Sequence, residues 1–172
     1  MVHLTLNSWI TSDQHWGHKN IQTYANRPEN HYELMRNRWC AAVDPSDVLL
    51  HLGDIVCFGN RDMHDGYLEG LPGRKMLIRG NHDNHKDDFY ESYGWTILGR
   101  GDKPFRWAWG DKIIAFSHEP LESGLFWDIN VHGHTHDNDH RPYTPMQGKR
   151  YINACVEKTD YAPVRLRDLL QR

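Results

Sequence analysis

The sequence has no long apolar run and only three cysteines among its 172 residues. No segment approaches the roughly 20 consecutive apolar residues that span a bilayer, and residues 1–10 have neither the basic start nor the continuous apolar stretch of a signal peptide. Cys40, Cys57 and Cys155 form neither an even set nor a metal-type cluster, so no structural disulfide is expected and a reducing environment is favoured. These absences predict a cytoplasmic protein without a membrane partner.

The sequence also lacks a strong charge imbalance, low-complexity tracts and internal repeats. Its 20 Lys and Arg residues nearly balance 23 Asp and Glu residues, for a formal net charge of -3. No global basic field therefore attracts long nucleic acids, although a local groove could still be positive, and small phosphorylated ligands fit this charge better. Apolar residues make up 38% of the chain. A chain of this length buries one core, which predicts a single domain over 1–172 and leaves the oligomeric state open.

Short apolar runs alternate with stretches of helix-like spacing in the first half of the chain. Two runs, 48–52 and 75–79, are nearly continuous, which is typical of strands buried on both faces. Further along, 95–98, 105–109 and 112–116 alternate with Gly-rich turns in the manner of hairpins. The other predicted strands are 8–13, 128–132 and 151–156, the predicted helices are 29–43, 60–69 and 85–93, and 164–170 is a strand end or a terminal helix turn. This order predicts an α/β domain that mixes parallel and antiparallel strands.

Polar blocks rich in histidine follow several of the predicted strands. The five blocks are Asp13-Gln14-His15, Gly53-Asp54, Gly80-Asn81-His82-Asp83, His118 and Gly133-His134-Thr135-His136. Asp13 and His15 are separated by one residue, as are His134 and His136. On an extended backbone alternate residues point the same way, so each pair is expected to aim both side chains at one point.

The side chains in these blocks have the chemistry of a metal site. Glycines precede Asp54, Asn81 and His134, where they allow sharp turns and close backbone approach. Carboxylate, amide and imidazole ligands without thiolate suit Mn, Fe or Zn rather than Ca or a structural Cys-bound Zn. Two divalent ions carry more charge than two carboxylates neutralise. The site would therefore stay electropositive and select an anionic substrate such as a phosphate ester.

The order of the blocks, with the Asp-x-His-x-Gly-His-x-Asn opening at 13–20, resembles the calcineurin-like metallophosphoesterase superfamily and its small prokaryotic and phage phosphohydrolases. The resemblance covers 13–136, and five weak blocks in one order make it specific. It implies an α/β fold, a four-layer α/β/β/α sandwich with two mixed β-sheets. It also implies a metal-dependent phosphoric ester hydrolase, with a phosphodiester preferred over a phosphomonoester as substrate.

The resemblance further implies that seven side chains hold two divalent metal ions, with Mn expected first and Fe, Zn or Ni as alternatives. One ion would be held by Asp13, His15, Asp54 and His136. The other would be held by Asp54, Asn81, His118 and His134, so that Asp54 bridges the pair. A hydroxide between the ions would attack phosphorus, and His82 would protonate the departing alkoxide as the general acid.

One position departs from the family pattern. The block after Gly53 often continues to a second Asp that orients the catalytic histidine, but Cys57 stands at that position here. A thiol cannot replace this carboxylate, and cations nearby should depress the pKa of His82. Asp83 or Asp62 could substitute for the missing Asp, and without such a partner the enzyme would favour substrates with good leaving groups.

Contacts to the substrate phosphate are expected from His18, Asn81 and Arg27. Arg27 offers a planar fork suited to phosphate, whereas His18 could instead only fold its loop. The tryptophans are expected in the core, with Trp16 and Trp127 as exceptions worth testing because they lie near the metal blocks. Two other functions stay open, a nuclease acting on short single strands and a non-catalytic binding scaffold with the same fold.

Overall fold

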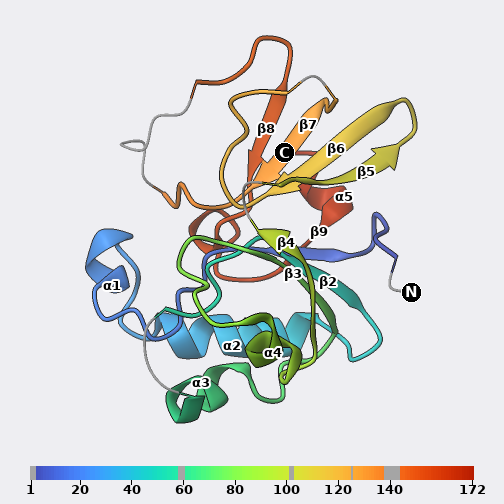
Figure 1. Ribbon diagram of the computed structural model, residues 1–172. Coiled ribbons are helices and arrows are strands. Elements are labelled where there is room, and N and C mark those ends of the chain that lie inside the picture. The colour runs from blue at the N-terminus through green and yellow to red at the C-terminus, as the bar shows by residue number, and fades with distance from the viewer. Residues whose placement is uncertain (1–2, 58–60, 101–102, 125, 138–143) are drawn as a thin grey trace.

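The computed structural model describes residues 3–57, 61–100, 103–124, 126–137 and 144–172. Two β-sheets face each other, and helices cover the far side of one of them (Figure 1). The strands of the first sheet, in spatial order, are β4 (Trp95–Arg100), β3 (Arg74–Arg79), β2 (Val48–His51), β1 (Trp9–Thr11) and β9 (Val164–Arg165). Strands β1 to β4 run parallel, and β9 is antiparallel to β1.

The second sheet has four strands and is also mixed. In spatial order they are β5 (Phe105–Trp109), β6 (Lys112–Ser117), β7 (Ile129–His132) and β8 (Arg150–Asn153). Strands β5 and β6 form an antiparallel hairpin, and β6, β7 and β8 run parallel. The prediction of an α/β domain with mixed sheets is therefore confirmed.

Helices lie below the first sheet in the view of Figure 1. The three that lie there are α2 (His31–Ala42), α3 (Arg61–Leu68) and α4 (Asp87–Glu91). The remaining helical segments are α1 (Ile21–Tyr24), the 3-10 turn η1 (Val156–Lys158) and α5 (Leu166–Leu169). No described helix has the length and apolar character needed to cross a bilayer.

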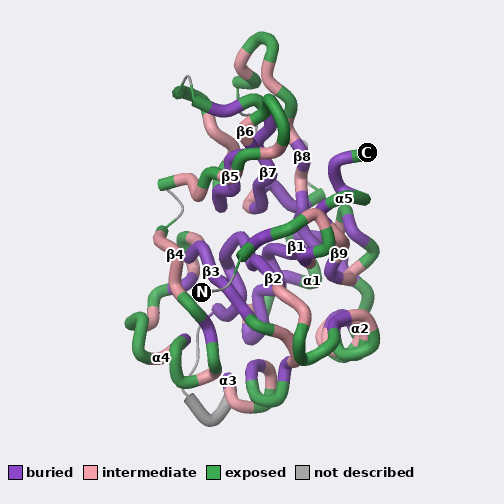
Figure 2. The backbone as a smooth tube through the Cα atoms, turned by 90° about the vertical axis from the view of Figure 1, so that its right-hand side faces the viewer, coloured by how far each residue is buried: buried purple, intermediate pink, exposed green. Residues whose placement is uncertain are grey.

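The central strands contain short apolar runs because both faces of the first sheet are buried. Successive residues of a strand point to opposite faces. Leu50 and Met76 accordingly pack in the core between the two sheets, while their neighbours Leu49 and Leu77 pack in a second core against the helices. In Figure 2 the buried stretches lie mainly along the strands of both sheets, as this arrangement requires.

The outer face of the second sheet is covered by a loop in the described part of the chain. Asn130 on β7 donates its amide to Ser117 Oγ at 2.9 Å and accepts the Leu121 N–H at 2.9 Å. Trp127, 1% exposed, packs edge-on against Tyr151 at 5.4 Å between ring centroids. Three of the four layers implied by the resemblance are therefore present, and the outer helical layer is not confirmed.

Most predicted elements are found within a few residues of their expected bounds, but the hairpin prediction is wrong for 95–98. This segment is β4, and it lies parallel to β3, with Trp95 opposite Lys75. Helix α4 makes the crossover between the two strands, and a parallel partner requires such a connection. The predicted strand at 151–156 ends at Asn153. The three cysteines are free thiols, as expected.

Candidate metal centre

The predicted ligands come from loops at the carboxyl ends of strands in both sheets. Asp13, Asp54 and Asn81 follow β1, β2 and β3 of the first sheet. His118 and His134 follow β6 and β7 of the second. Since β1 to β3 are parallel and β6 and β7 are parallel, each set of loops emerges at one edge of its sheet. The two edges meet, which brings ligands together from across the chain.

Three glycines permit this close approach. A Cβ built at Gly53 would lie 2.5 Å from the backbone nitrogen of Gly80, and Gly53 itself has φ +106°. A Cβ at Gly80 would collide with Asp54 Oδ1, and one at Gly133 would collide with Ser12 Oγ and Asp13 Oδ2. The predicted role of glycine before Asp54, Asn81 and His134 is thus confirmed.

Five ligands share an unusual backbone conformation. Their φ angles lie in the left-handed region, at 64° for Asp13, 53° for His15, 57° for Asp54, 67° for His134 and 50° for His136. For residues other than glycine this conformation costs about 1–3 kcal/mol each and is concentrated at functional sites. The prediction that the two paired blocks lie on extended backbone is wrong, because sharp turns rather than strand alternation aim these side chains.

The ligand atoms form two groups that share Asp54. In the first, His15 Nε2 lies 3.4 Å from Asp54 Oδ2 and 3.6 Å from Asp13 Oδ1, and His136 Nε2 lies 3.7 Å from the same Asp13 oxygen. With metal–ligand bonds of about 2.0–2.2 Å, two ligands of one ion are roughly 3–3.5 Å apart. The three distances in the first group, 3.4 to 3.7 Å, are close to this spacing, so a small inward shift would let these side chains share one ion.

The second group lies on the other side of Asp54. His118 Nε2 is 3.3 Å from Asp54 Oδ2, 2.9 Å from Asn81 Oδ1 and 3.1 Å from His134 Nδ1. His118 Nδ1 donates to the Leu52 carbonyl at 2.9 Å. Such a bond fixes the tautomer in which Nε2 can bind a metal.

Buried atoms in the first group lack hydrogen-bond partners among the described residues. Asp13 Oδ1 and both ring nitrogens of His15 have none. The other oxygen of Asp13 accepts three hydrogen bonds, from Ser12 Oγ at 2.5 Å, His134 N at 2.9 Å and Cys155 Sγ at 3.3 Å. One carboxylate oxygen is thus anchored and the other faces the histidines. A divalent ion would satisfy these atoms, so the donor set fits one.

The protein's own charges compensate one another in this site. Burial alone would raise the pKa of Asp13, but His15, His118 and His136 hold it well below its usual value. Burial would lower the pKa of His118, but Asp54 and Asp13 raise it to about 9. The carboxylates are therefore ionised, and bound metal would replace the proton on His118.

Arg27 and Glu157 support the first group. The sequence predicted a phosphate contact for Arg27 and no role for Glu157. Glu157 Oε1 lies 3.0 Å from His136 Nδ1 and accepts Arg27 Nε at 2.8 Å and Nη2 at 2.6 Å. Arg27 also donates to the carbonyls of Gln14 at 2.7 Å and Asp13 at 2.6 Å. Arg27, 4% exposed, does not line the pocket described below and instead holds the ligand loops from behind. No sequence signal pointed to Glu157, which belongs to no block.

Asp83 and Cys57 lie beside this site. The Asp83 carboxylate accepts backbone N–H groups of Asp54 at 2.7 Å, Ile55 at 3.0 Å and Gly80 at 2.9 Å. Asp83 thus fixes two ligand turns, and burial with the nearby Asp54 charge raises its pKa to about 7. The pKa of Cys57 is raised to about 12 by burial and the same carboxylates, so it is a neutral thiol. The side chain of Asp62 lies outside the described residues.

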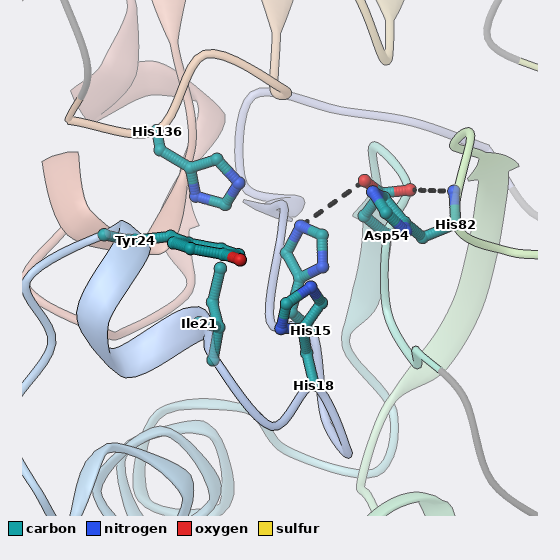
Figure 3. Close-up of a pocket in the computed structure, with 8 residues that line it drawn as sticks. His15, His18, Ile21, Tyr24, Asp54, His82 and His136 are labelled. Carbon is teal, nitrogen blue, oxygen red and sulfur yellow. Dashed lines mark hydrogen bonds and ion pairs between the residues drawn. The ribbon is translucent and has the colours of Figure 1, made fainter.

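A pocket of about 220 Å³ opens onto the first ligand group (Figure 3). It is lined by His15, His18, Ile21, Tyr24, Ala25, Asp54, His82 and His136. Predicted ligands therefore share one cavity with the predicted acid His82 and the predicted phosphate contact His18. The backbone N–H of His82 donates to Asp54 Oδ1 at 2.8 Å, which joins the acid-bearing turn to the ligand shared by both groups.

Comparisons with known proteins identify three similar sequences, and no protein-family model matches the chain. Uncharacterized protein MJ1445 of Methanocaldococcus jannaschii is 30% identical over 168 residues, which span 92% of this chain and 86% of that protein. The gene 66 protein of Mycobacterium phage L5 is 39% identical over 86% of this chain and 82% of its own. The gene 66 protein of Mycobacterium phage D29 is 40% identical over 88% of each.

Solved structures with the same arrangement of strands are more distant in sequence. A protein of unknown function from Aquifex aeolicus, AQ665, has a TM-score of 0.71 at 23% identity and covers 95% of this chain and 97% of its own. Pseudomonas putida nuclease MPE has a TM-score of 0.50 at 19% identity, over 87% of this chain and 73% of its own. These likenesses show the fold alone.

Proposed function

The chain belongs to the same family as the gene 66 proteins of mycobacteriophages L5 and D29, and we propose that it is a dinuclear metal-dependent phosphoesterase of the calcineurin-like superfamily. The observation that carries the proposal is the convergence of all seven predicted ligands into two groups joined by Asp54. Ligands so far apart in sequence have no other common structural role. A small phosphodiester is the proposed substrate, with a phosphomonoester second.

Each of the two groups would bind one metal ion. Asp13, His15, Asp54 and His136 would hold one divalent ion, and Asp54, Asn81, His118 and His134 the other. Bound ions would supply positive charge for the phosphate oxygens and a water of lowered pKa as nucleophile. Manganese is proposed first, because the donor set contains carboxylate, amide and imidazole groups.

The chain's own side chains would complete the reaction on the pocket side. His82 lies 5.1 Å from His15 between ring centroids and faces the same cavity. From there it would deliver a proton to the departing alkoxide, a contribution of about 10²–10⁴ in rate. His18 lines the same cavity, and Asn81 belongs to the second group. Each of these two side chains would contact the substrate phosphate. Arg27 would hold the ligand loops in position through its bonds to the carbonyls of Asp13 and Gln14.

Two alternatives have less support. A binding scaffold needs no intact ligand set, whereas here all seven predicted ligands converge and five of them adopt a costly backbone conformation. A nuclease for short single strands remains the second candidate, since nuclease MPE shares the fold. The formal net charge of -3 does not favour it.

Removal of single ligands tests the proposal. Asp54→Ala and His134→Ala should each abolish metal-dependent hydrolysis of bis(para-nitrophenyl) phosphate, whereas Asp88→Ala on the exposed surface of α4 should retain it. Protein purified without chelator should contain two equivalents of divalent metal, and Asp54→Ala should contain fewer. Full activity in either ligand variant, or wild-type protein that binds no metal, would contradict the assignment.

A further inference from the structure

The pocket has a second wall that holds no predicted ligand. Ile21, Tyr24 and Ala25, from α1 and the residue after it, also line the cavity. Figure 3 shows Ile21 and Tyr24 beside His15 and His136. The Tyr24 side chain extends from α1 into this space, and its ring meets the ring of His18 edge-on at 5.9 Å. Tyr24 is 68% exposed, so its ring is open to a ligand in this cavity.

This wall is tied firmly to the metal centre. The carbonyl of His18 accepts both the Ile21 N–H at 3.3 Å and the Tyr32 hydroxyl at 3.0 Å, which fixes the start of α1. Behind α1, the Arg27 N–H donates to the Gln22 carbonyl at 2.9 Å, and the Arg27 guanidinium reaches the Asp13 carbonyl at 2.6 Å. The backbone that carries Tyr24 therefore keeps a set position relative to the predicted ligands, which favours a preformed binding surface.

The two walls differ in the chemistry that they offer. The wall of the pocket that carries the predicted ligands presents imidazoles and a carboxylate, which suits metal-bound phosphate. The α1 wall presents one exposed aromatic face beside the aliphatic Ile21 and Ala25, and an aromatic face stacks well with a planar ring. Trp16 and Trp127, the two exceptions to a core position that the sequence left open, are both buried.

We propose that the α1 wall binds the nucleobase of a small nucleoside phosphoester, with Tyr24 as the stacking platform. The proposal rests on the proposed function and deepens it, because it names the organic group that accompanies the phosphate. A flat ring of this size matches one base, and a small cavity of about 220 Å³ matches a mononucleotide better than a strand. Tyr24 is then a specificity-determining residue.

Two diesters with the same leaving group provide the kinetic test. The para-nitrophenyl ester of thymidine monophosphate carries a base, and ethyl para-nitrophenyl phosphate does not. Wild-type protein with manganese should prefer the thymidine ester, and Tyr24→Ala should lower this preference in kcat/KM by roughly 5- to 100-fold, the value of one stacked base. Tyr24→Phe should keep the preference. Phe126→Ala, which removes an equally exposed ring (73%) that does not line the pocket, should also keep it.

Binding separates this proposal from the proposed function. Calorimetry with thymidine monophosphate and with inorganic phosphate should show that Tyr24→Ala weakens the first selectively, whether or not the protein turns over either ester. The proposed stacking role of Tyr24 would be contradicted if Tyr24→Ala lost the same affinity for both ligands or lost none. It would also be contradicted if wild-type protein did not bind thymidine monophosphate. Failure to cleave either ester, with selective binding intact, would instead overturn the proposed hydrolysis.

Discussion

Replacing Glu157 with Gln should weaken metal binding although Glu157 would touch neither ion. Its carboxylate lies 3.0 Å from His136 Nδ1, while His136 Nε2 faces Asp13 Oδ1 at 3.7 Å. This bond keeps the proton on Nδ1 and the lone pair on Nε2, where a metal would bind. Loss of such a partner typically costs 10- to 100-fold in metal affinity, or about 1.4 to 2.7 kcal/mol.

The same substitution perturbs a buried ion pair. Arg27 and Glu157 are 2.6 Å apart, and their side chains are 0% and 3% exposed. Removing one partner of such a pair costs about 3–5 kcal/mol in the free energy of unfolding, because the other charge stays buried. Glu157→Ala should approach this cost. Glu157→Gln keeps an acceptor oxygen for both Arg27 and His136 but loses the negative charge that strengthens these bonds. It should therefore unfold at higher urea concentration than Glu157→Ala, and its loss of metal affinity should lie near the lower end of the 10- to 100-fold range, at about 10-fold.

Calorimetric titration of metal-stripped protein with manganese is the assay. Wild type and Glu157→Gln should differ in the affinity of one equivalent, while Glu91→Gln on the exposed end of α4 should match wild type. Urea unfolding of the metal-free proteins must show that Glu157→Gln is folded under the titration conditions. Equal affinities for both equivalents in folded wild type and Glu157→Gln would refute the reasoning.

Three further predictions follow from the packing and charges of the centre. Gly133→Ala should cost about 1–3 kcal/mol in urea unfolding and lower manganese affinity, because its Cβ would collide with Ser12 and Asp13; unchanged affinity would contradict this. Gly66→Ala on α3, where a Cβ would meet none of the described residues within 4 Å, should instead stabilise the protein in urea unfolding by about 0.5–1 kcal/mol. The pKa of about 9 at His118 means that it is protonated near pH 7 without metal. Metal binding should release this proton, so affinity should rise with pH up to about 9 and calorimetric enthalpies should depend on the buffer; independence from both would show that His118 carries no proton.

Local features of the chain could be predicted because they depend on neighbouring residues. Buried strands at 48–52 and 75–79 follow from nearly continuous apolar runs of strand length, which are typical of a strand covered on both faces. The partner of 95–98 could not be predicted in this way. A hairpin and a parallel crossover have the same local pattern, and the choice depends on which strand edge the folded sheet leaves open.

The candidate site also has features that the sequence predicts and features that only tertiary contacts decide. The types and order of the predicted ligands are properties of the sequence, and together with the family resemblance they predicted seven side chains that the structure brings close together. The turns that aim Asp13 and His15 were predicted wrongly, since a left-handed backbone is stable only where surrounding contacts compensate for its cost. Arg27 likewise offered phosphate chemistry in the sequence, and only its partner Glu157, far along the chain, directs it behind the ligand loops.

The sequence by itself therefore determined which chemical groups this protein can offer, because residue types and their spacing are covalent facts. The tertiary structure alone decided which of those groups meet, which are buried behind others, and that an exposed Tyr24 stands beside the ligands. These outcomes depend on packing between segments distant in the chain, such as Glu157 against Arg27, and no short stretch of residues encodes them.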